Sequence, residues 1–144
     1  MSLLLLLCVG AISGCGALAP SPTARAQQPL PAIAHPFHAT MKTLDGAFIV
    51  ALDITPNRSG PNVFMVQVRD SRTGKPATPV AITLYFTMQD MPMGTDSITL
   101  HVGGSGLFSA TSNDLSMGGH WAISMTIQTP DQRIHKAGVR VLTS

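Results

Sequence analysis

Two short segments of this 144-residue chain contain the side chains best suited to chemistry. They are residues 87–94, Thr-Met-Gln-Asp-Met-Pro-Met-Gly, and residues 115–121, Leu-Ser-Met-Gly-Gly-His-Trp. Together they supply thioethers, an imidazole and an indole, on Met88, Met91, Met93, Met117, His120 and Trp121. Thioethers and imidazoles are ligands for soft metal ions, so the chemistry that these residues predict is metal binding.

Monovalent copper, Cu(I), fits such a ligand set because it is a soft ion and imidazole completes a mixed nitrogen and sulfur shell. Methionine needs no deprotonation, so the site would also work in an oxidising compartment where paired cysteines become disulfides. Met91 and Met93 are two residues apart and fall on one face of an extended chain. Trp121 would shield the ion, through a cation–π contact or by excluding water.

The alternative is that these side chains fill the end of a hydrophobic core. Methionine is an adaptable core residue, and a large tryptophan such as Trp121 is typical of a sandwich core. Met88 and Met125 continue apolar stripes, so both are assigned to packing, and Met88 is kept as a secondary ligand candidate.

For Met91, Met93 and Met117 both interpretations stay open, because these residues stand outside the stripes and next to Asp90 or glycines. The same holds for His120. Two further histidines are expected at the surface, His101 and His135.

Alternating apolar and polar residues from about residue 38 onward predict the strands that position these groups. Strands are expected at 47–54, 62–69, 79–88, 97–102, 107–111, 119–128 and 134–142. Two apolar stripes stand out, Val80, Ile82, Leu84, Phe86 and Met88, and then Trp121, Ile123, Met125 and Ile127. The lack of glutamate, with 13 glycines and 11 prolines, also favours turn-rich β structure.

The spacing of strands and turns predicts an all-β fold, an antiparallel immunoglobulin-like β-sandwich of seven or eight strands. In such a sandwich the third and sixth strands, here 79–88 and 119–128, are antiparallel neighbours. The end of one then lies beside the start of the other. This topology would bring the two methionine-bearing segments together.

The formal net charge of +2 and the scattered Lys and Arg residues leave no basic stripe, so nucleic-acid binding is not expected. Both cysteines, Cys8 and Cys15, lie in the first fifteen residues. The predicted domain therefore has neither a disulfide nor a thiolate metal site.

Residues 1–15 are predicted to be a signal peptide ending in a lipobox. The apolar run is too short to span a bilayer, and it leads to Ile12-Ser-Gly-Cys15, which resembles the lipobox of bacterial lipoproteins. Cleavage before Cys15 would leave that thiol to bear the lipid and anchor the protein to the extracytoplasmic face of the membrane. The alternative is cleavage after Ala26, which would give a soluble secreted or periplasmic protein. Residues 16–36, rich in Pro and Ala, are predicted to be a flexible tether.

The predicted sandwich, residues 37–144, resembles the YtkA-like domain family, which is related to FixH and to the exported C-terminal domain of copper-resistance membrane proteins. The resemblance runs from about Gly60 to Trp121. Its most specific pieces are Asp90-Met-Pro-Met-Gly94 and Leu115-Ser-Met-Gly-Gly-His-Trp121. It also covers Gly60-Pro-Asn62, the strand and turn from Val66 to Pro76, and the strand end from Leu84 to Met88.

The resemblance implies a small immunoglobulin-like sandwich and a link to copper handling or respiratory-oxidase maturation. It places Met91, Met93 and Met117 at the methionine positions of the family, whereas a role for His120 rests on its chemistry alone. A copper transporter or an oxidase assembly factor in the membrane is the partner that the resemblance implies.

The leading hypothesis is therefore an exported, lipid-anchored accessory protein that binds Cu(I). The alternative is a metal-free interaction module of the cell envelope, binding partners at the edge of its sheet. We expect no enzyme activity. The local candidate for a catalytic triad is Ser116, His120 and Asp114, and residues so close in sequence seldom adopt that geometry.

Overall fold

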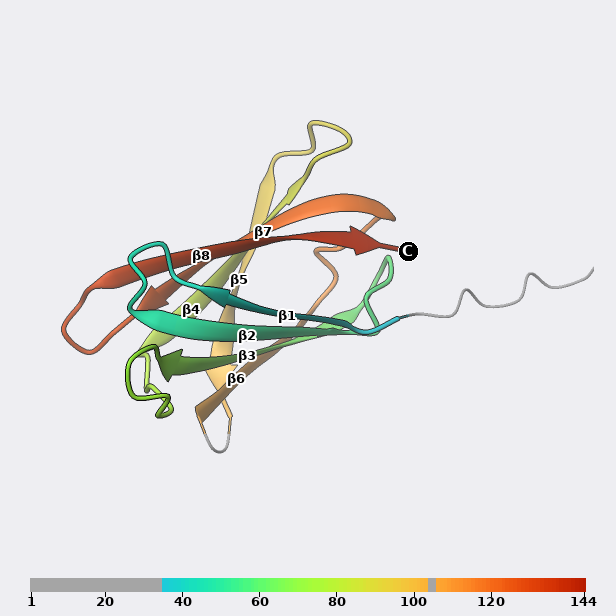
Figure 1. Cartoon of the computed structure of the whole chain (residues 1–144). Helices are drawn as coiled ribbons and strands as arrows, with labels where there is room; N and C mark the ends of the chain where they lie inside the picture. The colour runs from blue at the N-terminus through green and yellow to red at the C-terminus, as the bar shows by residue number, and fades with distance from the viewer. Residues whose placement is uncertain (1–34, 104–105) are drawn as a thin grey trace, which may run out of the picture. The chain divides into compact units, whose positions relative to one another are not determined.

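A computed structural model describes residues 35–103 and 106–144, which form eight β-strands (Figure 1). Their bounds are β1 Phe37–Lys42, β2 Phe48–Thr55, β3 Asn62–Asp70, β4 Ala81–Met88, β5 Thr95–Val102, β6 Leu107–Ser112, β7 Gly119–Gln128 and β8 Ile134–Thr143. No helix within these two ranges is long and apolar enough to cross a membrane. The predicted signal peptide with Cys15, and the tether up to residue 34, lie outside the described residues.

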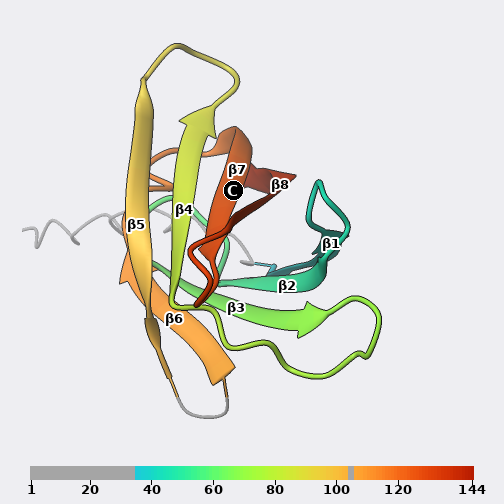
Figure 2. The ribbon, with the colours of Figure 1, turned by 90° about the vertical axis from the view of Figure 1, so that its left-hand side faces the viewer.

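The strands form an antiparallel sheet in the order β1-β2-β3-β6-β5-β4-β7-β8, which folds over into two layers. One layer is β1-β2-β3-β6, and the other is β5-β4-β7-β8. Strand β5 joins the layers, because it pairs with β4 along most of its length and with β6 at His101 and Val102. Figure 2 shows β5, β4 and β7 running across the direction of β2 and β3. The predicted all-β antiparallel sandwich is confirmed.

The core lies between the layers and is filled by the alternate residues of both apolar stripes. Ile82, Leu84 and Phe86 from β4 are fully buried, as are Ile123 and Ile127 from β7. Opposite them pack the inward residues of β2 and β3, namely Val50, Leu52, Ile54, Phe64, Val66 and Val68. Period-2 burial is what an antiparallel sheet with one buried face requires.

Two features of the strand pattern differ from expectation. Val80 is exposed because β4 begins only at Ala81, so the first residue of the predicted stripe lies outside the sheet. Strand β1 was not predicted. Its outward residues His38, Thr40 and Lys42 are polar and its inward residues are only half-buried, so it adds little to the core. Pairing with β2 nevertheless recruits this segment into the sheet.

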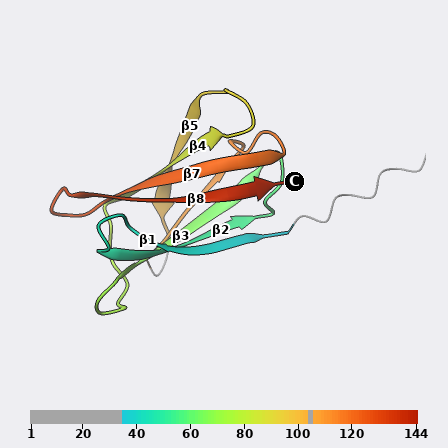
Figure 3. The same cartoon turned by 45° about the horizontal axis from the view of Figure 1, so that its top comes forward.

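The prediction that His135 lies at the surface is wrong, since only 8 % of this residue is exposed. The turn between β1 and β2 folds over β8, where the Leu44 amide donates to the Lys136 carbonyl oxygen at 2.7 Å. His135 lies beneath this turn, with its Nδ1 atom 2.5 Å from Asp45 Oδ2 and its ring edge-on to Phe48. Figure 3 shows β1 and β8 on the same side of the domain, where this contact joins them.

The Asp45 carboxylate is a pH-sensitive part of this contact. A hydrogen bond from the Thr43 hydroxyl, then one from the Ala47 amide and one from His135, lower the pKa of Asp45 from 3.8 to about 2. A carboxylate with a depressed folded-state pKa stabilises the fold above its unfolded pKa, and that stabilisation is lost as the pH falls toward the folded value.

Replacing Asp45 with Asn should therefore reduce the free energy of unfolding at neutral pH, and the deficit should shrink between pH 3.8 and about 2. Urea denaturation of wild type and Asp45→Asn from pH 6 to pH 2 measures this difference. Asp96→Asn, at an exposed position on β5, is the matched control. A deficit that stays constant over this pH range would show that ionisation of Asp45 is not its source.

Candidate metal centre

Strands β4 and β7 bring the two methionine-bearing segments to one end of the sheet. In their antiparallel register Met88 lies opposite Trp121, and one residue further the Gln89 amide donates to the His120 carbonyl oxygen at 2.8 Å. Strand β4 therefore ends where β7 begins. The expected pairing of these two strands is confirmed, although they are about thirty residues apart in sequence.

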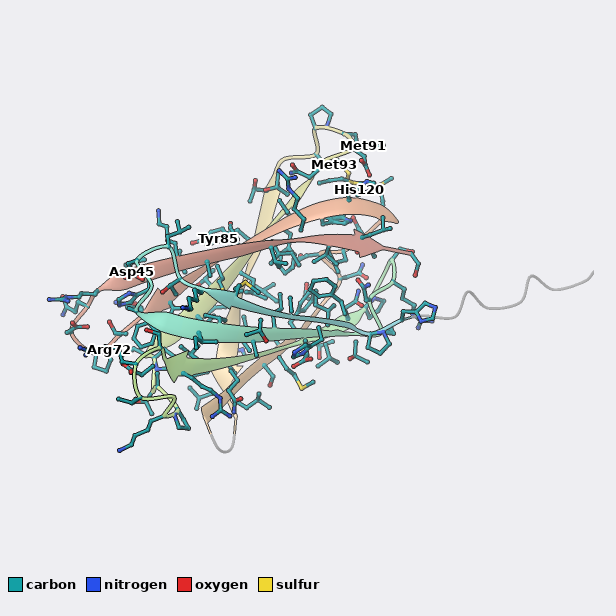
Figure 4. All side chains as sticks on the ribbon, viewed as in Figure 1. Asp45, Arg72, Tyr85, Met91, Met93 and His120 are labelled. Carbon is teal, nitrogen blue, oxygen red and sulfur yellow. The ribbon has the colours of Figure 1, made fainter. Side chains whose placement is uncertain are left out.

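The loop between β4 and β5 holds Met91 and Met93 and projects beyond the rest of the sheet (Figures 1 and 2). Both residues are well exposed, at 45 % and 47 %. Gly94 has a φ of 85°, a left-handed conformation that suits glycine and turns the chain into β5. Figure 4 shows Met91 and Met93 at the same end of the molecule as His120.

His120 at the start of β7 is held by Asp90. The His120 amide donates to Asp90 Oδ2 at 2.7 Å, and the Nδ1 atom lies 3.1 Å from Oδ1. These two hydrogen bonds, with the amide bond the stronger cause, lower the pKa of Asp90. An ionised carboxylate can only accept hydrogen bonds, so Nδ1 must bear a proton, and in the neutral imidazole Nε2 is then the nitrogen with the lone pair.

The close approach of Asp90 to β7 depends on Gly119. This residue has a φ of 136°, and a Cβ atom there would lie 2.5 Å from Asp90 Oδ2 and 2.8 Å from the terminal methyl of Met88. A side chain at this position would push the carboxylate away from His120. The second glycine of the Met-Gly-Gly-His sequence therefore has a steric reason.

The segment between β6 and β7 bears Met117, and buried contacts hold its backbone in place. Leu115 is fully buried, and its carbonyl oxygen accepts a hydrogen bond from the Gly60 amide at 2.9 Å. The Trp121 indole donates to the Met117 carbonyl oxygen at 3.1 Å. Met117 itself is 38 % exposed, so its backbone is anchored while its side chain reaches solvent.

Met88 and Trp121 belong to the core, where both are buried among the inward residues of the two layers. This agrees with the packing role assigned to Met88. Trp121 fixes the segment that bears Met117, and its indole is not open to solvent. The local triad candidate is not assembled either, since Asp114 accepts from the Ser112 hydroxyl and His120 pairs with Asp90.

The structure thus brings Met91, Met93, Met117 and His120 to one end of β4 and β7. Sequence reasoning missed Asp90 as a functional residue, although it heads the Asp-Met-Pro-Met-Gly motif. The available signal was the position of Asp90 at the end of a strand that was predicted to lie beside the start of the strand bearing His120, because a metal-binding histidine usually has a carboxylate partner. No group of three or more His, Cys, Asp or Glu residues within 35–103 and 106–144 is placed to hold a metal ion, so any metal site here depends on thioethers.

Comparison with known proteins gives one match. The family model described as YtkA-like matches residues 41–126, which include every strand from β2 to β6 and most of β7. No curated protein and no solved structure matches the chain. The matched range contains both methionine-bearing segments.

Proposed function

This chain belongs to the YtkA-like family, and on that premise we propose that it is an exported, lipid-anchored accessory protein that binds Cu(I). Its ligands would be the thioethers of Met91, Met93 and Met117 and the Nε2 atom of His120. The function would be to hold copper in the envelope or to deliver it to a membrane partner. A copper transporter and a respiratory-oxidase assembly factor are the partner classes that we propose.

The observation that favours this proposal is the Asp90–His120 pair at the end of β4 and β7 that also bears three exposed methionines. A carboxylate on Nδ1 is the usual outer partner of a metal-bound histidine, because it fixes the ring and directs Nε2 outward. The methionines at this end of the sheet lie outside the hydrophobic core, and they match the soft ligands that Cu(I) prefers. The thioether ligands, their exposure and the orientation of the His120 ring therefore all favour Cu(I).

This ligand set also suits transfer of the copper ion to a partner. Three thioethers and an imidazole are neutral, so the loaded centre would have the single positive charge of the ion, with the Asp90 carboxylate nearby as the balancing charge. Because the methionines lie on a projecting loop and in the segment before β7, a partner's ligands could approach the ion directly. The lipid on Cys15 would keep the domain close to a membrane partner.

An anaerobic Cu(I) titration against a chromophoric chelator tests the proposal. We expect the full chain to compete for one equivalent of Cu(I), because its four ligands form a single centre. Labelled methionine methyl groups should report the site in nuclear magnetic resonance spectra, with shifts for Met91, Met93 and Met117 but not for the core residue Met125. A protein that does not compete with the chelator would overturn the copper proposal.

A second candidate function is that of a metal-free interaction module. The observation that favours it is the edge of β5 that, in the part of the chain that the structure describes, lacks a paired strand over much of its length. Thr95 to Leu100 pair with β4, whereas β6 pairs only with His101 and Val102 within the described strands. An unpaired strand edge is a template for an added strand from a partner. Partner binding that is equal with and without copper, from a chain that does not bind Cu(I), would favour this function.

A further inference from the structure

We propose a second metal site, for divalent copper, on the outer face of the β1-β2-β3 layer, formed by His38, Asp53 and Met65. This site does not depend on the Cu(I) centre. It uses different residues on different strands and a harder set of ligands.

The three residues form one row across neighbouring strands. His38 on β1 pairs in register with Asp53 on β2, and Asp53 pairs with Met65 on β3. Each alternates with an inward core residue, since Leu52, Ile54 and Phe64 are fully buried. The row therefore lies on the solvent face. Side chains directly opposite each other have Cβ atoms about 4.5–5.5 Å apart, so the central carboxylate lies within reach of both neighbours.

The imidazole and carboxylate lie slightly closer together than two adjacent metal ligands would. His38 Nδ1 lies 2.6 Å from Asp53 Oδ1. Ligand atoms about 2.0–2.1 Å from an ion and at right angles to each other are separated by about 2.9 Å. A small opening of the pair would therefore let an ion replace the shared proton. Both side chains are open to solvent, with 63 % and 40 % exposed.

Met65 supplies the third ligand from the other side of Asp53. Its thioether is on a flexible, unbranched side chain that can rotate over the neighbouring carboxylate. Asp53 has no lysine or arginine partner among the ion pairs of the described residues; its partner there is His38. No lysine or arginine ion pair among the described residues therefore competes with a metal ion for this carboxylate.

The ligand types favour Cu(II) over other divalent ions. Imidazole and carboxylate are good Cu(II) ligands, and copper has the highest affinity of the divalent first-row ions for such sites. A thioether adds to this preference, because methionine is a weak axial ligand in copper sites and a poor ligand for harder ions. Water would complete the coordination, since the site is on an open surface.

Aerobic titration of the full chain with Cu(II), using glycine as competitor and electron paramagnetic resonance as readout, tests this site. We expect His38→Thr and Asp53→Asn each to weaken Cu(II) binding at least about tenfold, since each removes a ligand. The His38 variant should also lose the nitrogen coupling from the spectrum. Met65→Leu should remove the sulfur-to-copper charge-transfer absorption. Unchanged affinity in the His38 and Asp53 variants would overturn the inference.

The chain offers a matched control in the same row. Met65 pairs with Ser109 on β6, and Ser109 pairs with His101 on β5, so His101 is an exposed imidazole beyond the proposed site. His101→Thr should leave Cu(II) binding unchanged, and an equal loss there would overturn the inference.

The variant with Met91, Met93 and Met117 replaced by leucine separates the two proposals, because it should lose Cu(I) and keep Cu(II). Loss of Cu(II) binding in that variant would place the divalent ion at the Cu(I) centre and refute the second site.

Discussion

Replacing Met91, Met93 and Met117 together with leucine is expected to weaken Cu(I) binding at least about 100-fold, because losing three direct ligands should exceed the effect of losing an outer partner. His120 alone would remain, and a single imidazole is a poor site for Cu(I). The fold should persist, since leucine for methionine conserves volume and usually costs less than about 1.5 kcal/mol even in a core. Anaerobic competition with a chromophoric chelator measures the affinity.

Met41→Leu is the control for this variant. Met41 is half-buried on β1 and packs against the core, so the same substitution there changes a methionine without touching the proposed centre. It should bind Cu(I) as the wild type does. Equal affinity in the triple variant and the control would mean that the three exposed thioethers are not the ligands.

Replacing Asn62 with Ala is expected to lower the free energy of unfolding by about 3–5 kcal/mol, since an unsatisfied buried group costs about 1–3 kcal/mol and several would be created. Asn62 is 1 % exposed at the start of β3. Its Oδ1 atom accepts from the Asn57 and Arg58 amides, and its Nδ2 donates to the carbonyl oxygens of Arg58 and Gly60. Alanine would leave all four backbone groups without this partner.

Urea denaturation followed by the fluorescence of Trp121, the single tryptophan, measures this loss. The control is Gln67→Ala, which removes an outward-facing amide from the same strand and should change stability by no more than about 0.5 kcal/mol. A similar small effect for Asn62→Ala would show that water replaces the four hydrogen bonds without cost.

The Asn62 bonds also support the candidate centre. They fix the turn before β3, and the Gly60 amide in that turn binds the carbonyl oxygen of Leu115. Leu115 in turn anchors the segment that presents Met117. The backbone of Met117 is thus held by a turn that is itself fixed by the buried Asn62 side chain, while Met91 and Met93 lie on the separate β4–β5 loop.

Three of the five histidines have Nδ1 beside an aspartate, and their environments give them different roles. His135 is buried under the β1–β2 turn, so its pair with Asp45 joins two outer strands. His38 and His120 are exposed, so their pairs with Asp53 and Asp90 leave the imidazoles open to a metal ion. The same two residue types therefore join outer strands in one place, and in the two proposed sites they would contribute to metal binding.

Much of the fold follows from local pattern. The alternation of apolar residues in 79–88 and 119–128 predicts two half-buried strands, and the structure confirms both as β4 and β7. The methionines of the two loops were distinguished from the core methionines by sequence, because they fall outside every apolar stripe and beside glycines or Asp90, and all three are exposed in the structure. Periodicity and composition are properties of neighbouring residues, so a single sequence is enough to detect them.

Contacts between distant residues were decided by tertiary structure. Asp90 and His120 are thirty residues apart, and only the β4–β7 register, with Gly119 lacking a side chain, brings the carboxylate onto the imidazole. The burial of His135 depends on a turn ninety residues earlier in the chain. The row from His38 to Met65 depends on three strands pairing in one register. Sequence determined which faces are apolar, whereas strand order and register determined which polar groups meet, because those depend on the packing of the whole sheet.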